Sequence, residues 1–215
     1  MTRAVALIDY GSGNLRSAEK ALQRAAAGLA HPPAILTTDD PDAIARADAV
    51  VLPGVGAFSA CRRALDARPG VVEAIETAAR GRGAPFLGIC VGMQLRATRG
   101  LEFGETPGLG WIAGDVARLT PEGARNKVPH VGWNAVAFAS DNPLFAGLPA
   151  DVDMYFTHSF AFTPADPADV AACADHGGPV AAAVTRGNLA GVQFHPEKSQ
   201  AAGLALLANF LEWRP

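Results

Sequence analysis

The stretch Gly88-Ile89-Cys90-Val91-Gly92 decides how the centre of this chain can fold. An apolar run over 85–87 precedes it, and a short helical pattern over 93–96 follows it. Gly-x-Cys-x-Gly between a strand and a helix is typical of a sharp turn that exposes a nucleophile. The residues two before and two after the cysteine approach each other closely in such a turn, so both must be small. We therefore expect Cys90 to stand at a helix N-terminus, where the helix dipole favours a thiolate over a thiol.

A structural interpretation of the same stretch stays open at this point. Cysteine is often a small buried hydrophobe, and a glycine-rich loop can hold one without any chemistry. A base and an orienting acid elsewhere in the chain are what would favour the catalytic interpretation.

Composition narrows the class of protein. Of the 215 residues, 49% are hydrophobic and 18% are charged, so the chain can bury a large core and disorder is not expected. The net charge of −3 argues against a protein built to hold nucleic acid or an anionic membrane. The three cysteines are sparse and lack metal-ligand spacing, and no apolar run is typical of a membrane span or a signal peptide. We expect one cytoplasmic domain over 1–215, with no metal and no cofactor.

The order of the apolar runs predicts an α/β fold. Buried parallel strands are expected at 4–8, 34–37, 49–52 and 85–87, with helices at 15–27, 42–46, 59–67 and 71–80. After a loop over 100–110, shorter strands predict antiparallel pairs, at 114–117, 128, 133–136, 154–160, 180–184 and 189–194. A helical turn is expected at 141–145 and a last helix at 200–213. The predicted fold class is a single α/β domain with a mostly parallel, doubly wound sheet, added antiparallel strands and helices on both faces.

Two glycine-containing loops have a chemical and a plain interpretation. In Pro53-Gly54-Val55-Gly56, two glycines flanking one residue let a peptide turn and offer N–H groups to a carbonyl oxygen, although an ordinary strand-to-helix loop has the same composition. The loop Gly11-Ser12-Gly13 after the first strand suggests a dinucleotide site. Against that, Arg16 occupies the third glycine position and would block close packing of helix on strand.

A histidine after the strand predicted over 189–194 supplies a base. His195-Pro196-Glu197 lies where α/β sheets place their ligands, and Pro196 lets Glu197 fold back toward the imidazole. A thiolate needs a base to take its proton and a third group to hold that base. Cys90, His195 and Glu197 supply these roles, and their order along the chain is no objection because geometry defines a triad.

With these motifs the chain resembles the triad-type (class I) glutamine amidotransferases, and among them the glutaminase subunits of imidazole glycerol phosphate synthases. The motifs that carry the resemblance are Asp9-Tyr10-Gly11-Ser12-Gly13-Asn14-Leu15, Pro53-Gly54-Val55-Gly56-Ala57-Phe58, Gly88-Ile89-Cys90-Val91-Gly92-Met93-Gln94, Lys127-Val128-Pro129-His130-Val131-Gly132-Trp133-Asn134, Tyr155-Phe156-Thr157-His158-Ser159 and Gln193-Phe194-His195-Pro196-Glu197-Lys198-Ser199. Two departures are Val91, where leucine is usual, and Phe160, where the family often has tyrosine. The second removes a hydroxyl and any hydrogen bond that it made.

The resemblance implies a reaction and a role for each residue. The substrate is L-glutamine, and the catalytic residues are Cys90, His195 and Glu197. An oxyanion hole is implied at Gly54, Val55, Gly56 and Val91, and substrate contacts at Gln94, His158 and Ser159. A (β/α)8-barrel cyclase subunit receives the ammonia in a heterodimer, with Asn14, Pro129, His130, Trp133 and Lys198 on the shared face or the ammonia path. The loop over 54–56 is expected to be out of position until that partner is loaded.

Three alternatives remain at this stage. The chain could be the glutaminase subunit of another synthase, such as one for aminobenzoate or pyridoxal phosphate, which Pro129-His130-Val131-Gly132-Trp133-Asn134 disfavours. It could be a non-catalytic regulatory module of the same fold, which the intact triad disfavours. A cysteine peptidase built on the same turn would be revealed by peptide hydrolysis.

Overall fold

The computed structural model describes residues 3–123, 126–138 and 142–215. Its centre is a nine-stranded sheet with the strand order β2-β1-β3-β4-β13-β12-β11-β8-β9. Neighbouring strands run parallel in the first part of this order, β2 (Ala34–Thr38), β1 (Ala4–Ile8), β3 (Ala49–Gly54), β4 (Phe86–Cys90) and β13 (Leu189–Val192). The side chains of β3, β4 and β13 are buried throughout, as expected for apolar strands that are covered on both faces.

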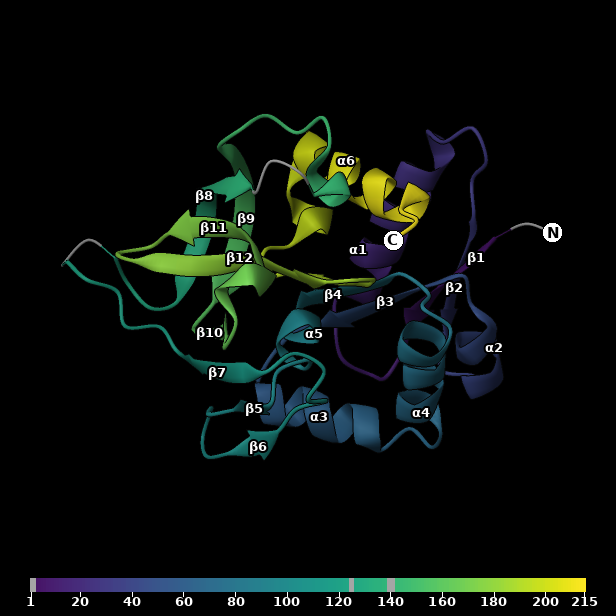
Figure 1. The fold of residues 1–215 in the computed structure, drawn as a ribbon, viewed down its shortest axis with the longest axis horizontal. Coiled ribbons are helices and arrows are strands. Elements are labelled where there is room, and N and C mark those ends of the chain that lie inside the picture. Colours follow the sequence, from purple (N-terminus) through teal and green to yellow (C-terminus); the bar gives the residue numbers. More distant parts are fainter. Residues whose placement is uncertain (1–2, 124–125, 139–141) are drawn as a thin grey trace.

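Helices cover the two faces of the parallel strands (Figure 1). On one face α1 (Leu15–Ala27) packs against α6 (Gln200–Glu212). The other face carries α2 (Pro41–Arg46), α3 (Phe58–Asp66), α4 (Val71–Glu76) and α5 (Val91–Gln94). The predicted doubly wound α/β fold is therefore confirmed. The helix predicted over 71–80 is present but changes its winding, since α4 continues into the π-helical segment η1 (Thr77–Gly81).

The remaining strands of the large sheet are antiparallel and extend beyond the helical layers (Figure 1). They are β12 (Pro179–Arg186), β11 (Val170–Asp175), β8 (His130–Phe138) and β9 (Val152–His158). β12 and β13 form the predicted hairpin, in which Arg186 pairs with Leu189. The added antiparallel strands expected after residue 111 are thus confirmed.

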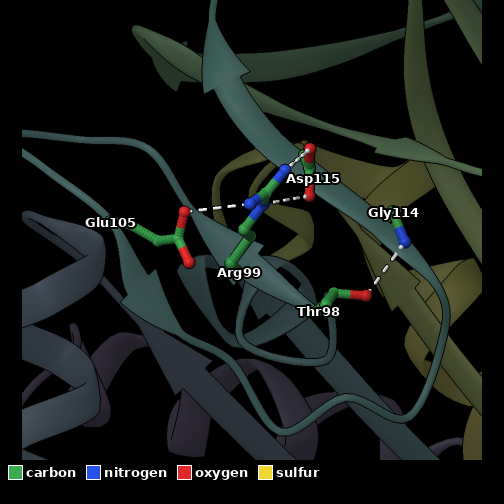
Figure 2. A network of polar contacts seen from close by, with 5 residues as sticks. All are labelled: Thr98, Arg99, Glu105, Gly114 and Asp115. Atoms are coloured by element: carbon green, nitrogen blue, oxygen red, sulfur yellow. Dashed lines mark hydrogen bonds and ion pairs between the residues drawn. The ribbon is translucent and has the colours of Figure 1, made fainter.

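A second sheet of four strands lies beside the first. Its order is β10-β7-β5-β6, with bounds Phe160–Pro164, Gly114–Arg118, Arg99–Gly100 and Thr106–Pro107. Figure 2 shows the polar contacts that tie its short strands together. Arg99 faces Asp115 across the β5–β7 pair and donates two hydrogen bonds to its carboxylate, at 2.9 and 3.1 Å, while its third nitrogen reaches Glu105 at 2.9 Å. This bidentate pairing lowers the pKa of Asp115.

Four details of the predicted secondary structure are wrong. The segment 100–110 is not only loop, because it contains β6 and the end of β5. The strand predicted over 154–160 is two strands, because the chain leaves β9 for the second sheet at Ser159. The strand β11 was not predicted, and Val128 lies outside any strand.

Short 3-10 turns complete the fold at η2 (Pro143–Phe145), η3 (Pro167–Asp169) and η4 (Pro196–Lys198). The turn predicted from 141 corresponds to η2, although Asp141 itself lies outside the described residues. Within the three described ranges, no helix has the length and apolar character needed to cross a membrane.

Candidate functional site

The turn around Cys90 has the geometry that its sequence required. Cys90 ends β4, and α5 begins at the next residue. The cysteine has φ 53° and ψ −112°, a backbone conformation that residues other than glycine rarely adopt. A Cβ atom added to Gly88 would collide with the carbonyl group of Gly92, and one added to Gly92 would collide with the carbonyl oxygen of Leu52. Both flanking glycines are therefore required by close backbone contact, as predicted.

The sulfur lies on a cavity of about 370 Å³, a volume typical of small-molecule sites. The cavity lies where β3 and β4 end and just after β13. The predicted site residues that line it are Val55, Gly56, Cys90, Val91, Gln94, Pro129, His158, Ser159, His195 and Lys198. The structure thus brings the nucleophile, the base and most of the predicted contact residues to one place.

His195 and Glu197 form a buried pair beside this cavity. Nδ1 of His195 donates to Oε1 of Glu197 at 2.8 Å, and both side chains are 3% exposed. The turn η4, which begins at Pro196, brings the carboxylate back to the ring in the way the sequence predicted. With Nδ1 engaged, the other ring nitrogen, Nε2, is left for the sulfur.

The charge of His195 follows from these neighbours. Burial alone would lower its pKa, but the adjacent Cys90 sulfur and the Glu197 carboxylate outweigh burial and raise the pKa to about 9. Its Nε2 is buried and has no partner in hydrogen-bond geometry among the described residues. Among the causes that raise the pKa of His195, the contact with the Cys90 side chain comes first, which places the sulfur close to this ring.

The glycine loop beside Cys90 is held by hydrogen bonds to two of its carbonyl groups. The Val55 carbonyl accepts hydrogen bonds from Ser12 Oγ at 3.0 Å and from Cys61 Sγ at 3.2 Å, and Tyr10 donates to the Pro53 carbonyl at 2.7 Å. Within the loop 53–56, Gly56 is the residue with a positive φ, of 95°. Gly54 is needed for a different reason, because its Cβ would lie 2.7 Å from the nitrogen of Gly92. Gly54 borders a neighbouring pocket of only about 10 Å³ and does not line the main cavity.

Gln94 lies on the cavity wall with its amide group already engaged. Its Nε2 donates to the Phe160 carbonyl and to Oε1 of Gln193, both at 2.9 Å. Since the two hydrogens of Nε2 are used, only Oε1 of Gln94 is available to a bound molecule. The backbone of Phe160, and not its side chain, makes the polar contact at this position, so the missing tyrosine hydroxyl does not affect Gln94.

His158 and His130 form a chain of hydrogen bonds behind the cavity wall. Nδ1 of His158 donates to the Phe160 carbonyl at 3.0 Å, which leaves His158 Nε2 as the acceptor for His130 Nδ1, also at 3.0 Å. His130 Nε2 then accepts from Asn134 Nδ2 at 3.1 Å. Burial is the main cause that lowers the pKa of His130 to about 3 and that of His158 to about 4.

The five residues predicted to face a partner do not share one location. Pro129 and Lys198 line the cavity, and Trp133 is 48% exposed with its ring edge against Tyr155 at 5.8 Å between centroids. His130 is buried, so its side chain is not on the surface of this chain. Asn14 precedes α1 and borders the small pocket behind the triad together with Glu197.

Four further residues belong to the site that the sequence analysis did not assign to the cavity. Glu102, Thr157 and Phe160 line the cavity, and Gln193 lies behind it with its Nε2 3.6 Å from the Cys90 sulfur. Gln193 was visible only as part of the Gln-Phe-His-Pro-Glu motif, and Glu102 lies in the segment predicted as loop. No cluster of three potential metal ligands is present in the part of the chain that the structure describes.

The family model described as glutamine amidotransferase class-I matches residues 6–213. The chain belongs to this family. It is 62% identical over 213 residues to the imidazole glycerol phosphate synthase subunit HisH of Caulobacter vibrioides, an alignment that covers 99% of this chain and all of that protein. The subunit of the same name from Rhodospirillum rubrum is 55% identical over 212 residues, covering 98% of this chain and 99% of that one.

Solved structures support the fold of this glutamine amidotransferase. A crystal structure of a glutamine amidotransferase has a TM-score of 0.69 at 19% identity and covers 96% of this chain and 97% of its own. The structure of PurLQS from Thermotoga maritima has a TM-score of 0.66 at 20% identity and covers 99% of both chains. At these identities the likeness bears on the fold alone.

Proposed function

We propose that this amidotransferase is the glutaminase subunit of an imidazole glycerol phosphate synthase. The observation that carries the chemistry is the buried His195–Glu197 pair, whose histidine lines the same cavity as Cys90. The choice of synthase is supported by full-length identities of 52–62% to subunits of that name. Its partner is a (β/α)8-barrel cyclase subunit, to which it delivers ammonia in the cytoplasm.

The first half of the reaction uses the proton held on His195. With a pKa raised to about 9, the imidazole of His195 carries a proton at neutral pH. The reactive form of a cysteine nucleophile is its thiolate. The sulfur attacks the side-chain amide carbon of glutamine, and the resulting oxyanion is stabilised by the N–H of Val91 and the loop over 54–56. His195 gives its proton to the leaving nitrogen, so ammonia departs and a thioester remains.

The second half returns the enzyme to its starting state. Neutral His195 takes a proton from water, the hydroxide oxygen adds to the thioester carbon, and the carbon–sulfur bond breaks to give the Cys90 thiolate and the γ-carboxylic acid of the product, which becomes glutamate by releasing its proton to water. Glu197 keeps the ring oriented through Nδ1 and stabilises the imidazolium in both halves.

Charged groups on the cavity wall match the two ends of the amino-acid substrate. Glu102 has its Oε2 occupied by the Phe58 N–H at 2.8 Å, which leaves Oε1 for the α-ammonium group of glutamine. Gln94 can only accept, so it also suits the ammonium group. Lys198 supplies the positive charge for the α-carboxylate.

The partner surface is inferred from exposed apolar groups beside the cavity. Val131 and Trp133 on β8 are 56% and 48% exposed, and they pair with Thr157 and Tyr155 on β9. Thr157 lines the cavity, and the ammonium group of Lys198 lies 5.5 Å from the ring centroid of Tyr155. A partner docked on this surface would close the cavity from solvent and receive ammonia directly.

The test uses the chain together with the cyclase subunit. Cys90→Ala should abolish synthesis from glutamine, while synthesis from added ammonia persists, because the two sites are separate. Cys173→Ala is the matched control, since Cys173 lies on β11 and does not line the cavity. Loss of both activities in Cys90→Ala would contradict separate sites, and ammonia transfer to a different synthase partner would assign the chain to another pathway.

The isolated chain should show little glutaminase activity. We infer that the loop over 54–56 completes the oxyanion hole only when the partner is loaded. Steady-state glutaminase rates with and without the cyclase subunit and its nucleotide ligand measure this effect. A full rate from the chain alone would overturn the gating.

A further inference from the structure

Gln193 touches the nucleophile but has no role in the reaction as described so far. It follows β13, two residues before His195, and its side chain is fully buried. Its Nε2 donates a hydrogen bond to the Cys90 sulfur at 3.6 Å, an ordinary length for a bond to sulfur. Among the side chains of the described residues, that of Gln193 is the one that makes a hydrogen bond to this sulfur, and the bond requires no bound substrate.

The neighbours of Gln193 fix which end of its amide faces the sulfur. Oε1 of Gln193 accepts from Gln94 Nε2 at 2.9 Å, so Oε1 points to Gln94 and Nε2 to Cys90. Gln94 is fixed in turn, because its Nε2 also donates to the Phe160 carbonyl at 2.9 Å. A reversed Gln193 amide would place Nε2 against the Gln94 donor and an oxygen against the sulfur, which loses both hydrogen bonds.

We propose that Gln193 is a further catalytic residue, which donates a hydrogen bond to the Cys90 thiolate and is oriented for this by Gln94. A thiolate accepts a hydrogen bond more strongly than a thiol does, so this donor favours the charged nucleophile. Unlike a second cation, a neutral amide does this without disfavouring the proton on His195. The inference deepens the proposed glutaminase reaction and rests on it for the turnover measurements alone.

The donor acts in two states of the reaction. In the free enzyme it stabilises the resting thiolate. In the second half, the carbon–sulfur bond of the thioester breaks and the electron pair returns to sulfur, where Gln193 stabilises the developing charge. In the thioester between these states, the sulfur is a poor acceptor and gains little from the donor. Removing the donor should therefore slow breakdown of the thioester and leave binding of glutamine nearly unchanged.

The pH dependence of Cys90 alkylation tests the hydrogen bond directly. Iodoacetamide reacts with the thiolate, and mass spectrometry of the peptide that contains Cys90 separates its reaction from those of Cys61 and Cys173. In Gln193→Met, which keeps the volume and removes the donor, the pH midpoint of alkylation should rise by about one pH unit. The plateau rate at high pH reports access to the sulfur and should stay near that of the unchanged chain. Gln23→Met, at an exposed position on α1, is the control and should shift neither quantity.

Turnover and a second variant complete the test. In the complex, Gln193→Met should lower kcat about tenfold with little change in KM, whereas a merely structural loss would alter the plateau rate or the fold. Gln94→Met frees the Gln193 amide to rotate, so it should also raise the pH midpoint of alkylation, by less than Gln193→Met does. If Gln193→Met does not fold, the midpoint of Gln94→Met decides whether the proposal holds. An unchanged midpoint in a folded variant overturns the proposal. A shifted midpoint in a complex that hydrolyses no glutamine would overturn the proposed function and leave the hydrogen bond in place.

Discussion

The histidine pair behind the cavity makes the stability of this protein sensitive to mild acid. His130 lies between two rings, with centroids 4.6 Å from Phe156 and 4.0 Å from His176, and its side chain is buried. Each nitrogen of His130 and of His158 already has a partner whose direction is set by the chain from Asn134 to the Phe160 carbonyl. Neither ring can take a proton without breaking a hydrogen bond and charging a buried group.

The sign and size follow from linkage between protonation and folding. With folded-state pKa values of about 3 and about 4 against an ordinary 6.5, both rings stay neutral in the folded protein at pH 5, while both are protonated in the unfolded chain. The unfolded state then binds more protons, so the free energy of unfolding falls as the pH falls below 6.5. Between pH 7 and pH 5 the loss is about 2 kcal/mol for each histidine, or about 4 kcal/mol for the pair.

Urea unfolding at several pH values between 7 and 5 measures this loss. In His130→Phe the ring can keep its stacking on Phe156 and His176 but cannot take a proton, so the fall over this interval should drop to about 2 kcal/mol. The variant should also be about 1 kcal/mol less stable at pH 7, because His158 Nε2 loses its donor. His31→Gln, at an exposed position, is the control and should leave the slope unchanged. Equal slopes for the unchanged chain and His130→Phe would refute the reasoning, since His130 would then bind a proton equally well in both states.

Three other substitutions test separate parts of the structure. Gly88→Ala should destabilise the fold by several kcal/mol and abolish glutaminase activity, because its methyl group collides with Gly92, and a urea midpoint near that of the unchanged chain would contradict this. Arg96→Met should leave the free energy of unfolding unchanged or raise it by about 1–4 kcal/mol. The reason is that Arg96 is fully buried, its Nη1 has no partner among the described residues, and burial lowers its pKa to about 9. A loss of more than about 2 kcal/mol would contradict this. Glu197→Gln should lower kcat by about a hundredfold or more. In the unchanged chain, the raised pKa of His195 stabilises the fold fully below pH 6.5, and this stabilisation disappears as the pH passes about 9. The loss of stability between pH 6.5 and 9 should therefore be smaller in Glu197→Gln.

The parts of the site that could be predicted are those that local backbone geometry dictates. The glycines at 88 and 92 signal a close contact within five residues, and His195-Pro196-Glu197 needs only one 3-10 turn to bring carboxylate and ring together. The parallel strands were predicted from continuous apolar runs, which a sheet covered on both faces requires. In each case the cause and its effect lie close together in the sequence.

The parts that could not be predicted depend on side chains that are distant in sequence. Gln193 meets Cys90 across 103 positions, Gln94 meets the Phe160 carbonyl across 66, and His130 meets His158 across 28. His130 and His158 are on strands, where polar residues have the same alternation whether they face solvent or each other. The passage of the chain from one sheet to the other at Ser159 is hidden for the same reason, since the apolar and polar positions continue to alternate through it.

The neutral state of His158 bears on how His195 can hold a proton. His158 lines the same cavity as His195, and a proton on one ring lowers the affinity of the other for a proton. Burial lowers the pKa of His158 to about 4, which outweighs the opposite effect of its hydrogen bond to the Phe160 carbonyl and leaves the ring neutral at physiological pH. In the proposed reaction, His195 holds its proton until the leaving nitrogen needs it. Under the proposed mechanism, one of these two imidazoles serves as the acid–base group, because burial disfavours a proton on the other.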